Sequence, residues 1–350
     1  MTQPLVSIIT VNYNETAVTL ELLRSIERNS YRNVEVIVVD NASRETPRPA
    51  IEREFPGVRV LESAENLGFA GGNNLGVDVA RGAYLFFINN DAELTDGCLE
   101  GLLGIFEQHP NAGIASPQLH YFPGQTTNKH DESDGGHHPN TAANKHDPQR
   151  STTTLIQYSG ATPVYPLTAR NRTLGHQEPD CGQFGVTPTP TAYAHGAAML
   201  VPRRVLDAVG PMLEDYFLYY EELDWCERIR RAGYSVWVHP GVRVYHKESL
   251  ATGKISALKM YYLTRNRILF LRRNFGAGAR AAFFTFFALV TTPKHLLTLM
   301  LRRDWTNLRA FGRAIAWHFR HPLPPRFPAV RRRAASGSAD PAPSVPNPLA

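Results

Sequence analysis

Ala83-Tyr-Leu-Phe-Phe-Ile-Asn89-Asn90-Asp91 is the stretch that says most about the fold. A short apolar run that ends at polar residues is typical of a strand buried on both faces of a sheet. Ligands of open α/β sheets bind just beyond the carboxyl ends of such strands. Asp91 is therefore a candidate for binding a metal ion or phosphate groups. The alternative is that Asp91 caps the helix expected after Thr95-Asp96.

Strands and helices alternate on both sides of this stretch, over residues 5–116. We expect strands at Val6–Val11, Val34–Val39, Val58–Leu61 and Ala83–Ile88. We expect one helix to begin at a cap on Asn14 and another to cover Asn73–Ala80. This regular alternation predicts an α/β fold with a mostly parallel sheet and helices on both faces.

Structure is expected to resume near Leu155, after a change of composition. Residues 120–154 are rich in Pro, Gly, Asn, Asp, His and Thr, and Asn128-Lys-His-Asp131 recurs as Asn144-Lys-His-Asp147. We interpret this part as a solvated, mobile insertion. Beyond it, the pattern predicts helices at Pro202–Gly210 and Glu221–Ala232 and strands at Tyr234–Val238 and Val242–Tyr245.

Composition limits the class of protein. The chain has 350 residues, of which 43% are apolar, so a full core is expected. Its three cysteines form no CxxC pair, which argues against a disulfide framework or a zinc knuckle and favours a reducing compartment. The apolar run that begins at Val6 is too short for a signal peptide or a membrane span.

Positive charge is concentrated near the C-terminus. Between Arg265 and Arg333 there are fifteen Lys or Arg and one acid, Asp304, a net +14, so that the rest of a chain with net charge +5 carries −9. The apolar runs at Ala281–Val290 and Leu296–Leu301, separated by Pro293, predict a helical hairpin or an interfacial helix. Flanking arginines suit an anionic lipid surface. The alternative is an ordinary C-terminal helix that packs on the domain.

Nucleic acid is the other anionic partner to consider for a chain with an isoelectric point of about 9.1. No binding motif for nucleic acid accompanies the charge, and the basic segment carries apolar runs that suit a membrane. We therefore expect no nucleic-acid partner.

Polar residues follow several of the predicted strands. Thr10 and Asn12 end the first strand, Asp40 ends the second, and Asn90 lies beside Asp91. Asp40 is placed to accept hydrogen bonds from a nucleotide base or ribose, and the alternative is a turn formed with Asn41.

The segment from Glu65 to Asn74 is rich in Gly and Asn and precedes a predicted helix. Glycines let the backbone approach a ligand, and a helix N-terminus favours phosphate. The segment is neither a GxGxxG nor a Walker sequence, so neither a dinucleotide fold nor a P-loop is supported.

A cluster of acids opens the helix predicted at Glu221. On a helical projection, Glu222 falls near the centre of the apolar face, whereas Glu221 and Asp224 point well away from it. An inward carboxylate is costly unless it has a partner or a function. We therefore favour Glu222 as a general base, and the alternative is that the acids complement the helix dipole.

His246 ends the last predicted strand. An imidazole is a common ligand of divalent ions, so His246 together with Asp91 is a candidate site for Mn²⁺ or Mg²⁺. His195 and His239 are the competing histidines, and a purely structural role is the alternative.

Five motifs occur in order along the chain. They are Thr10-Val-Asn-Tyr-Asn14, Val36-Ile-Val-Val-Asp40-Asn-Ala-Ser43, Asn66-Leu-Gly-Phe-Ala-Gly-Gly-Asn-Asn74, Phe87-Ile-Asn-Asn-Asp91 and Tyr219-Tyr-Glu-Glu-Leu-Asp-Trp225. Together they resemble the inverting glycosyltransferases of family 2, which have the GT-A fold, and the rhamnosyltransferase-like branch above all. The resemblance covers roughly residues 5–270.

This resemblance implies roles for the residues named above. The nucleotide-sugar would be bound by residues of the first four motifs, which are Thr10, Asn12, Asp40, Asn66, Asn74 and Asn90. A divalent cation (Mn²⁺ or Mg²⁺) would be held by Asp91 and His246, and an acid of the set Glu222, Glu221 and Asp224 would be the catalytic base. Many relatives have Asp-x-Asp where this chain has Asn89, so one negative charge fewer is available for the metal.

The implied activity is transfer of a sugar, with dTDP-rhamnose the expected donor, to a lipid-linked or polysaccharide acceptor in bacterial cell-surface glycan synthesis. Galactofuranosyl, mannosyl or glucosyl transfer and a catalytically silent nucleotide-sugar-binding scaffold are the alternatives. The expected location is cytoplasmic, on the inner face of the cell membrane. We expect a nucleotide-sugar half at 1–118, an insertion at 119–154, an acceptor half at 155–262, a basic helical region at 263–328 and a disordered tail at 329–350.

Overall fold

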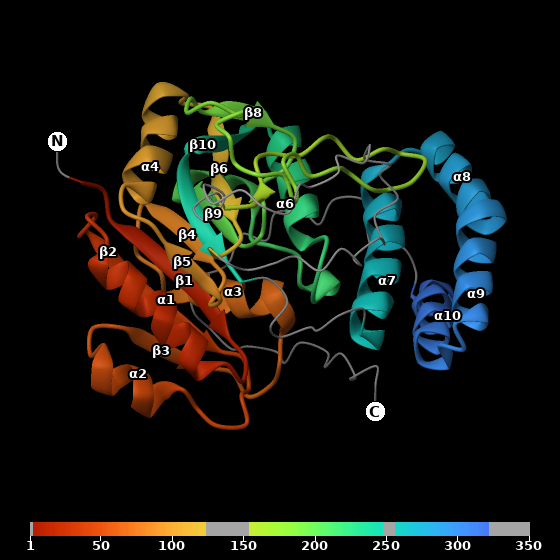
Figure 1. Ribbon diagram of the computed structural model, residues 1–350, viewed down its shortest axis with the longest axis horizontal. Coiled ribbons are helices and arrows are strands. Elements are labelled where there is room, and N and C mark those ends of the chain that lie inside the picture. The colour runs from red at the N-terminus through yellow and green to blue at the C-terminus, as the bar shows by residue number, and fades with distance from the viewer. Residues whose placement is uncertain (1–2, 124–153, 248–255, 322–350) are drawn as a thin grey trace, which may run out of the picture.

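A computed structural model describes residues 3–123, 154–247 and 256–321. Most of the predicted insertion and the tail at 329–350 lie outside the described residues. Within them the chain forms an α/β body joined to a group of C-terminal helices (Figure 1). The strands are β1 Val6–Asn12, β2 Val34–Asp40, β3 Arg59–Glu62, β4 Tyr84–Ile88, β5 Ala92–Leu94, β6 Ala112–His120, β7 Ile156–Tyr158, β8 Thr189–Thr191, β9 Ala198–Pro202 and β10 Ser235–His246. The α-helices are α1 Thr16–Arg28, α2 Arg48–Glu54, α3 Gly68–Val79, α4 Cys98–Gln108, α5 Arg203–Val209, α6 Glu221–Arg231, α7 Ala257–Asn274, α8 Ala277–Phe286, α9 Thr292–Leu301 and α10 Trp305–Arg320.

One sheet runs through the body in the order β3-β2-β1-β4-β9-β6-β10-β5, with β7 beside β6 and β8 beside β10. The first four strands are parallel, which confirms the prediction from the βα alternation. β9 is antiparallel to both β4 and β6, so the sheet becomes mixed in its second half. The strands expected at 234–238 and 242–245 form one strand, β10, with an irregular register between His239 and Arg243.

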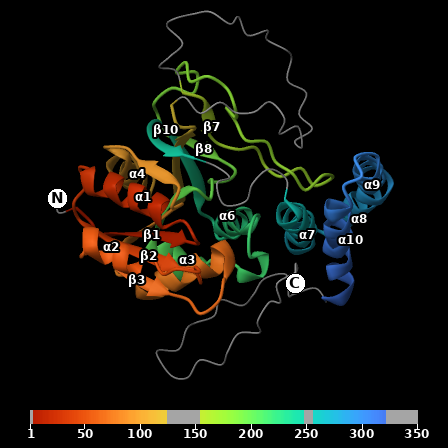
Figure 2. The ribbon, with the colours of Figure 1, turned by 60° about the horizontal axis from the view of Figure 1, so that its bottom comes forward.

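The apolar stretch quoted first is β4, in the centre of the sheet. Leu85, Phe86, Phe87 and Ile88 are all buried, as the unbroken apolar run predicts. Helices cover both faces of the sheet (Figure 2). Asn12 of β1 contacts α1 through Thr19 on one face.

The glycines of α3 pack against the opposite face of β1. A Cβ atom at Gly72 would lie 3.0 Å from Val11 Cγ1, and one at Gly76 would lie 2.5 Å from Ile9 Cγ2. Glycine is therefore required for the close approach of helix to strand. The helix expected at Asn73–Ala80 begins five residues earlier, at Gly68, because tertiary packing compensates for the low helix propensity of these glycines.

Two further expectations about helix ends are wrong. Asn14 does not cap α1: it has φ 60°, and its Oδ1 accepts from Arg44 N at 2.8 Å, which ties it to the loop after β2. Asp91 does not cap the following helix, because β5 lies between it and α4. The capping alternative for Asp91 is thereby removed.

The C-terminal helices α8, α9 and α10 lie on the far side of α7 from the sheet (Figures 1 and 2). By length and composition alone, the helix from Ala277 to Leu301 could cross a membrane. Only 11% of its most apolar 18-residue stretch is buried within the protein. Pro293 does not interrupt it, so a hairpin within 281–301 is wrong. A π-helical turn at Phe287–Thr291 precedes the proline, which occupies the first turn of α9, where its missing N–H costs little.

Candidate active site

The polar residues at the ends of β1, β2 and β4 form one chain of hydrogen bonds. Asn12 and Asp40 are register partners, and Asn12 Nδ2 donates to Asp40 Oδ1 at 2.9 Å. Asn12 Oδ1 accepts from Thr19 Oγ1 at 2.9 Å, and that hydroxyl accepts from Asn90 Nδ2 at 3.1 Å. The three strand ends therefore meet at one edge of the sheet, where an open α/β fold binds its ligand.

These bonds also occupy much of the polar surface expected to contact a nucleotide. Asp40 Oδ1 accepts from Ser43 Oγ at 2.5 Å as well as from Asn12, which is the local turn considered as the alternative. Thr10 is fully buried, and its hydroxyl has no hydrogen-bond partner within the described part of the chain. The structure thus shows how the edge is shaped, and nucleotide binding by these residues stays a prediction.

Asn41 closes the loop that begins α3. Its Oδ1 accepts from Leu67 N at 2.9 Å, and its Nδ2 donates to Asn66 Oδ1 at 2.9 Å. Asn74 lies on the other side of α3, where its buried Nδ2 donates to Met212 O at 2.9 Å and Glu214 Oε1 at 2.8 Å. Asn66 therefore lies in the loop at the sheet edge, whereas Asn74 ties α3 to the segment before α6.

Asp91 and His246 meet although they are far apart in sequence. His246 is the last residue of β10 and pairs with Ala92 of β5, which places its Nε2 3.1 Å from Asp91 Oδ1. Asn89 Nδ2 lies 3.1 Å from the same nitrogen. Burial raises the pKa of Asp91, but the hydrogen bond and charge of His246 outweigh this, and the net shift is downward. Asp91 is thus an ionised carboxylate at neutral pH.

Gln157 of β7 orients the imidazole. His246 Nδ1 lies 2.8 Å from Gln157 Oε1, which is an acceptor, so Nδ1 carries a proton. Nε2 is then the nitrogen that faces Asp91: it donates to the carboxylate when the ring is protonated, and its lone pair is available to a cation when the ring is neutral. Outer partners of this kind hold metal-binding histidines in the required tautomer.

The pair fits a divalent ion. Two neighbouring ligands of an octahedral ion that binds each at about 2.1 Å are separated by about 3 Å, and the Asp91–His246 spacing of 3.1 Å agrees with this. No group of three or more His, Cys, Asp or Glu that could hold a metal occurs among the described residues. A hard ion that keeps waters or phosphates as its other ligands needs no such group.

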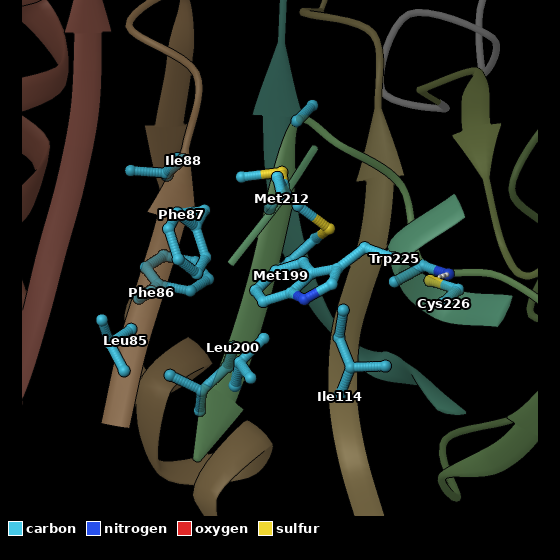
Figure 3. Close-up of a cluster of buried hydrophobic side chains, with 14 of the residues drawn as sticks. Leu85, Phe86, Phe87, Ile88, Ile114, Met199, Leu200, Met212, Trp225 and Cys226 are labelled. Atoms are coloured by element: carbon cyan, nitrogen blue, oxygen red, sulfur yellow. Dashed lines mark hydrogen bonds between the residues drawn. The ribbon is translucent and has the colours of Figure 1, made fainter. Parts of the chain in front are cut away.

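Trp225 anchors α6 in the core. Its ring packs edge-on against Phe87 of β4 at 5.4 Å between centroids, close to Met199 of β9 (Figure 3). Its Nε1 donates to Gly210 O at 2.8 Å. This anchor places the first turn of α6, with its acids, beyond the carboxyl end of β4.

The turn before α6 is held by α7. Phe217, Tyr219 and Tyr220 all have positive φ, at 63°, 68° and 74°, a conformation that costs roughly 1–3 kcal/mol for each such residue. Asn266 Nδ2 donates to the carbonyl oxygens of Tyr216, Leu218 and Tyr219 at 2.8, 2.7 and 2.8 Å. The strained backbone that presents Glu222 is therefore kept in place from α7.

The three acids of α6 differ in their surroundings. Asp224 is 2% exposed and accepts from Tyr216 Oη at 3.0 Å, Arg228 Nε at 3.1 Å and Asn274 Nδ2 at 2.8 Å, a structural ion-pair network. Glu221 is 4% exposed, and burial together with the charge of Glu222 raises its pKa well above the usual range. The prediction that Glu221 and Asp224 point away from the core is wrong, because α7 and the segment before α6 cover that face of α6.

Glu222 is partly buried, and burial raises its pKa to about 6. Glu222 Cγ and Phe69 Cζ each lie 3.8 Å from the position that a Cβ atom on Gly196 would occupy. Asn89 N donates to Ala197 O at 3.0 Å, and the rings of His195 and His246 lie 6.1 Å apart. Residues 195–197 thus lie between Glu222 on one side and the Asp91–His246 pair on the other.

The family model described as Glycosyl transferase family 2 matches residues 7–171, which include the strand ends and Asp91. Residues 7–171 are therefore a glycosyl transferase family 2 domain.

Two curated relatives of this glycosyltransferase are similar over most of its length. The N-acetylglucosaminyl-diphospho-decaprenol L-rhamnosyltransferase of Mycobacterium tuberculosis is 26% identical over 75% of this chain and 83% of that protein. A low-salt glycan biosynthesis hexosyltransferase of Haloferax volcanii is 25% identical over 75% of this chain and 74% of that protein. A crystal structure of GalNAc-T7 with UDP, GalNAc and Mn²⁺ matches with a TM-score of 0.61 at 16% identity, over 92% of this chain and 59% of that one, and confirms the GT-A fold.

Sequence reasoning missed several residues of this glycosyltransferase site. Gln157 and Gly196 carry no local signal, because each acts through a contact made only when distant segments fold together. Phe69 lies within the third motif, but the motif does not indicate its contact with Glu222. Asn41 was considered only as a turn partner of Asp40. The adjacent Asp-Asn pair at the end of a buried strand could have indicated that Asn41 closes the next loop.

Proposed function

We propose that this glycosyltransferase is an inverting enzyme that moves a sugar from a nucleotide-diphospho-sugar, with dTDP-rhamnose the favoured donor, to a hydroxyl of a lipid-linked or polysaccharide acceptor in cell-surface glycan synthesis. The donor assignment is supported by relatives that carry rhamnosyltransferase names, among them one from Shigella flexneri that is 23% identical. The hexosyltransferase name of the Haloferax relative favours a hexose as the second candidate.

The observation that carries the proposal is the position of Glu222. The stem of its side chain lies beside Gly196 and Phe69, close to the strand-end edge, and Glu222 also lines a cavity formed with α7. Its pKa of about 6 leaves it ionised, yet basic for a carboxylate, near neutral pH. Asp224, fixed by three donors, is unsuited to accept a proton.

In the proposed reaction, Glu222 accepts the proton of the acceptor hydroxyl while that oxygen bonds to the anomeric carbon of the donor. The bond from this carbon to the diphosphate oxygen breaks, and its electron pair leaves with the nucleoside diphosphate. One displacement of this kind inverts the anomeric centre. Asp91 and His246 would hold a divalent cation, which when bound supplies positive charge for the diphosphate.

We also propose that the protein lies on an anionic membrane surface. On the helix from Ala277 to Leu301, Leu289, Leu297 and Leu301 are 72%, 60% and 76% exposed. Exposed leucines on a helix that belongs to a strongly basic segment suit the boundary between lipid head groups and acyl chains.

The donor is tested by a thermal-shift screen of nucleotide-sugars with and without Mn²⁺, because a bound ligand raises the melting temperature according to its affinity. dTDP-rhamnose is expected to give the largest shift. The configuration of the product, measured by NMR, tests inversion.

The base is tested with Glu222→Gln, which keeps the shape of the side chain and removes its basicity. We expect transfer to fall by about 10²–10⁴-fold, the range for loss of a general base, with the donor-induced thermal shift retained. Glu107→Gln, the same change on the exposed surface of α4, should leave both unchanged. Near-normal transfer by Glu222→Gln would contradict the assignment and make Glu221 the next residue to test.

A further inference from the structure

A cavity of about 260 Å³ opens on the side of Glu222 that faces the C-terminal helices. One wall is a face of α7, which contributes Lys259, Leu263 and Arg267, among others, to the lining. The opposite wall comes from the loop that carries Arg170 and from the C-terminal helices. The cavity therefore joins the proposed base to the region that we place against the membrane.

The cavity is lined by cations. Arg170, Lys259 and Arg267 contribute to its surface together with His295, and Glu222 is the one carboxylate among the lining residues. Burial lowers the pKa of His295, and the positive charges of Arg170 and Arg267 lower it further. These groups thus act on one another at short range, and the cavity has a positive potential.

No acid in its own helical turn balances the positive charge of Lys259. The residue lies in the first turn of α7, where the helix dipole already places positive charge, and that turn contains no acid. The Lys259 ammonium forms no ion pair within the described ranges of the chain. The cations that line the cavity repel one another, and an anion bound among them relieves that repulsion.

The rest of the lining is apolar. Met260, Leu263, Phe287 and Phe311 contribute to it, and Phe287 belongs to the same long helix as the exposed Leu289. A ligand that satisfies both parts must combine an anionic group with an apolar chain. A phosphate ester of a long-chain alcohol has this combination.

We infer that this cavity binds the phosphate or diphosphate group of a lipid-carried acceptor, with Arg170, Lys259 and Arg267 around the anion and the sugar hydroxyl directed to Glu222. The inference rests on the proposed function and deepens it, since it names the chemical class of the acceptor and the residues that recognise it. The donor's own diphosphate is assigned to the Asp91–His246 pair, on the other side of residues 195–197.

Direct binding tests the inference without any transfer step. Farnesyl diphosphate is titrated into the full-length protein by calorimetry, with farnesol and inorganic pyrophosphate as the two partial ligands. The double variant Arg170→Gln/Lys259→Gln removes two cavity cations, and Arg313→Gln removes one exposed cation from α10 as the control. Arg267 is left intact because its Nε donates to Thr168 O and its side chain is buried.

We expect farnesyl diphosphate to bind the natural protein, and the double variant to weaken this affinity by at least about tenfold while Arg313→Gln leaves it unchanged. Farnesol should bind both forms equally. Inorganic pyrophosphate alone should bind more weakly than farnesyl diphosphate, since it lacks the chain. Equal affinity of the double variant and the natural protein for farnesyl diphosphate would overturn the inference, as would complete displacement of farnesyl diphosphate by a nucleoside diphosphate.

A transfer assay separates failure of this inference from failure of the proposed function. Two synthetic acceptors carry the same sugar, one on an alkyl diphosphate and one on a neutral alkyl ether. We expect the double variant to raise KM by about tenfold or more for the diphosphate acceptor only. Equal effects on both acceptors would overturn the inference and leave the transferase intact. Retained binding of farnesyl diphosphate without transfer to any acceptor would remove the proposed function alone.

Discussion

At the scale of single residues, the ionisation of Glu222 predicts the pH dependence of the reaction. Burial raises its pKa from the usual 4.5 of a glutamic acid to about 6. Only the ionised carboxylate accepts a proton, so below about pH 6 the rate at saturating substrates should fall about tenfold for each unit of decreasing pH. The measurement is kcat between about pH 4.5 and about pH 8, with folding followed in parallel.

A carboxyl group with an ordinary pKa would give a different profile. Its rate would stay level until about pH 4.5 and fall only below it. A level kcat down to about pH 5 in protein that remains folded would therefore contradict the role of Glu222 as the group that titrates.

Gln157 gives a second prediction at this scale. The Gln157→Ala variant frees the imidazole of His246 to rotate and to change tautomer, because Gln157 Oε1 is the partner of His246 Nδ1. Loss of such a partner typically lowers metal affinity by about 10–100-fold. We therefore expect the Mn²⁺ concentration that half-saturates the donor-dependent thermal shift to rise by about 10–100-fold.

The control for Gln157→Ala is Gln108→Ala, at an exposed position at the end of α4. This variant should keep the natural response to Mn²⁺. The same half-saturating Mn²⁺ concentration in both variants would show that Gln157 does not support the metal site.

At the scale of elements, the contact of α7 with the turn before α6 determines where Glu222 lies. Asn266→Ala removes the donor to the carbonyl oxygens of Tyr216, Leu218 and Tyr219, in a turn that also contains residues with positive φ. Loss of a buried donor of this kind costs about 1–3 kcal/mol. We expect a loss of this size in the free energy of unfolding in urea, together with a fall in kcat that exceeds any change in the donor KM.

The control for this element is Arg309→Ala, on the exposed side of α10. It should alter neither the stability nor kcat. An Asn266→Ala protein with reduced stability and an unchanged kcat would show that the clamp supports the fold and has no influence on the base.

Elements whose signals are local could be predicted from the sequence. β4 is an unbroken apolar run with polar residues at its end, and the parallel strands β1, β2 and β3 follow the βα pattern. The sequence therefore predicts the edge of the sheet where Asn12, Asp40 and Asn90 lie together. The pairing of Asp91 with His246 was anticipated from residue chemistry, and the structure brings the two side chains together.

Elements that depend on tertiary contacts could not be predicted in the same way. The glycines of α3 indicated a loop near a ligand, but they allow a helix to approach β1. Pro293 indicated a break, but the π-helical turn before it accommodates the ring. The burial of Glu221 and Asp224 depends on α7, whose position against α6 leaves no periodic trace in the sequence of α6.

At the scale of the whole molecule, the separation of charge and apolar surface predicts how the protein meets a membrane. The segment from Arg265 to Arg333 has a net charge of +14, and the long helix within it exposes Leu297 and Leu301. Basic residues near an anionic surface contribute about 1 kcal/mol each, and this attraction is screened by salt. Binding to vesicles with about 30% anionic lipid should therefore exceed binding to neutral vesicles and weaken as salt is added.

The apolar part of this binding is tested with Leu297→Gln/Leu301→Gln, because burying each leucine in lipid contributes about 1.5–3 kcal/mol. Co-sedimentation with the anionic vesicles should weaken by at least about tenfold. The control is Val186→Gln, an exposed apolar residue of the α/β body, which should bind as the natural protein does. If vesicle binding depends neither on lipid charge nor on the two leucines, and the protein also binds DNA in a salt-sensitive way, nucleic acid is instead the partner of the basic segment.

The cavity proposed for the acceptor opens beside the same helices. Loss of vesicle binding should therefore raise KM for an acceptor presented in vesicles and leave KM for a short, water-soluble acceptor unchanged.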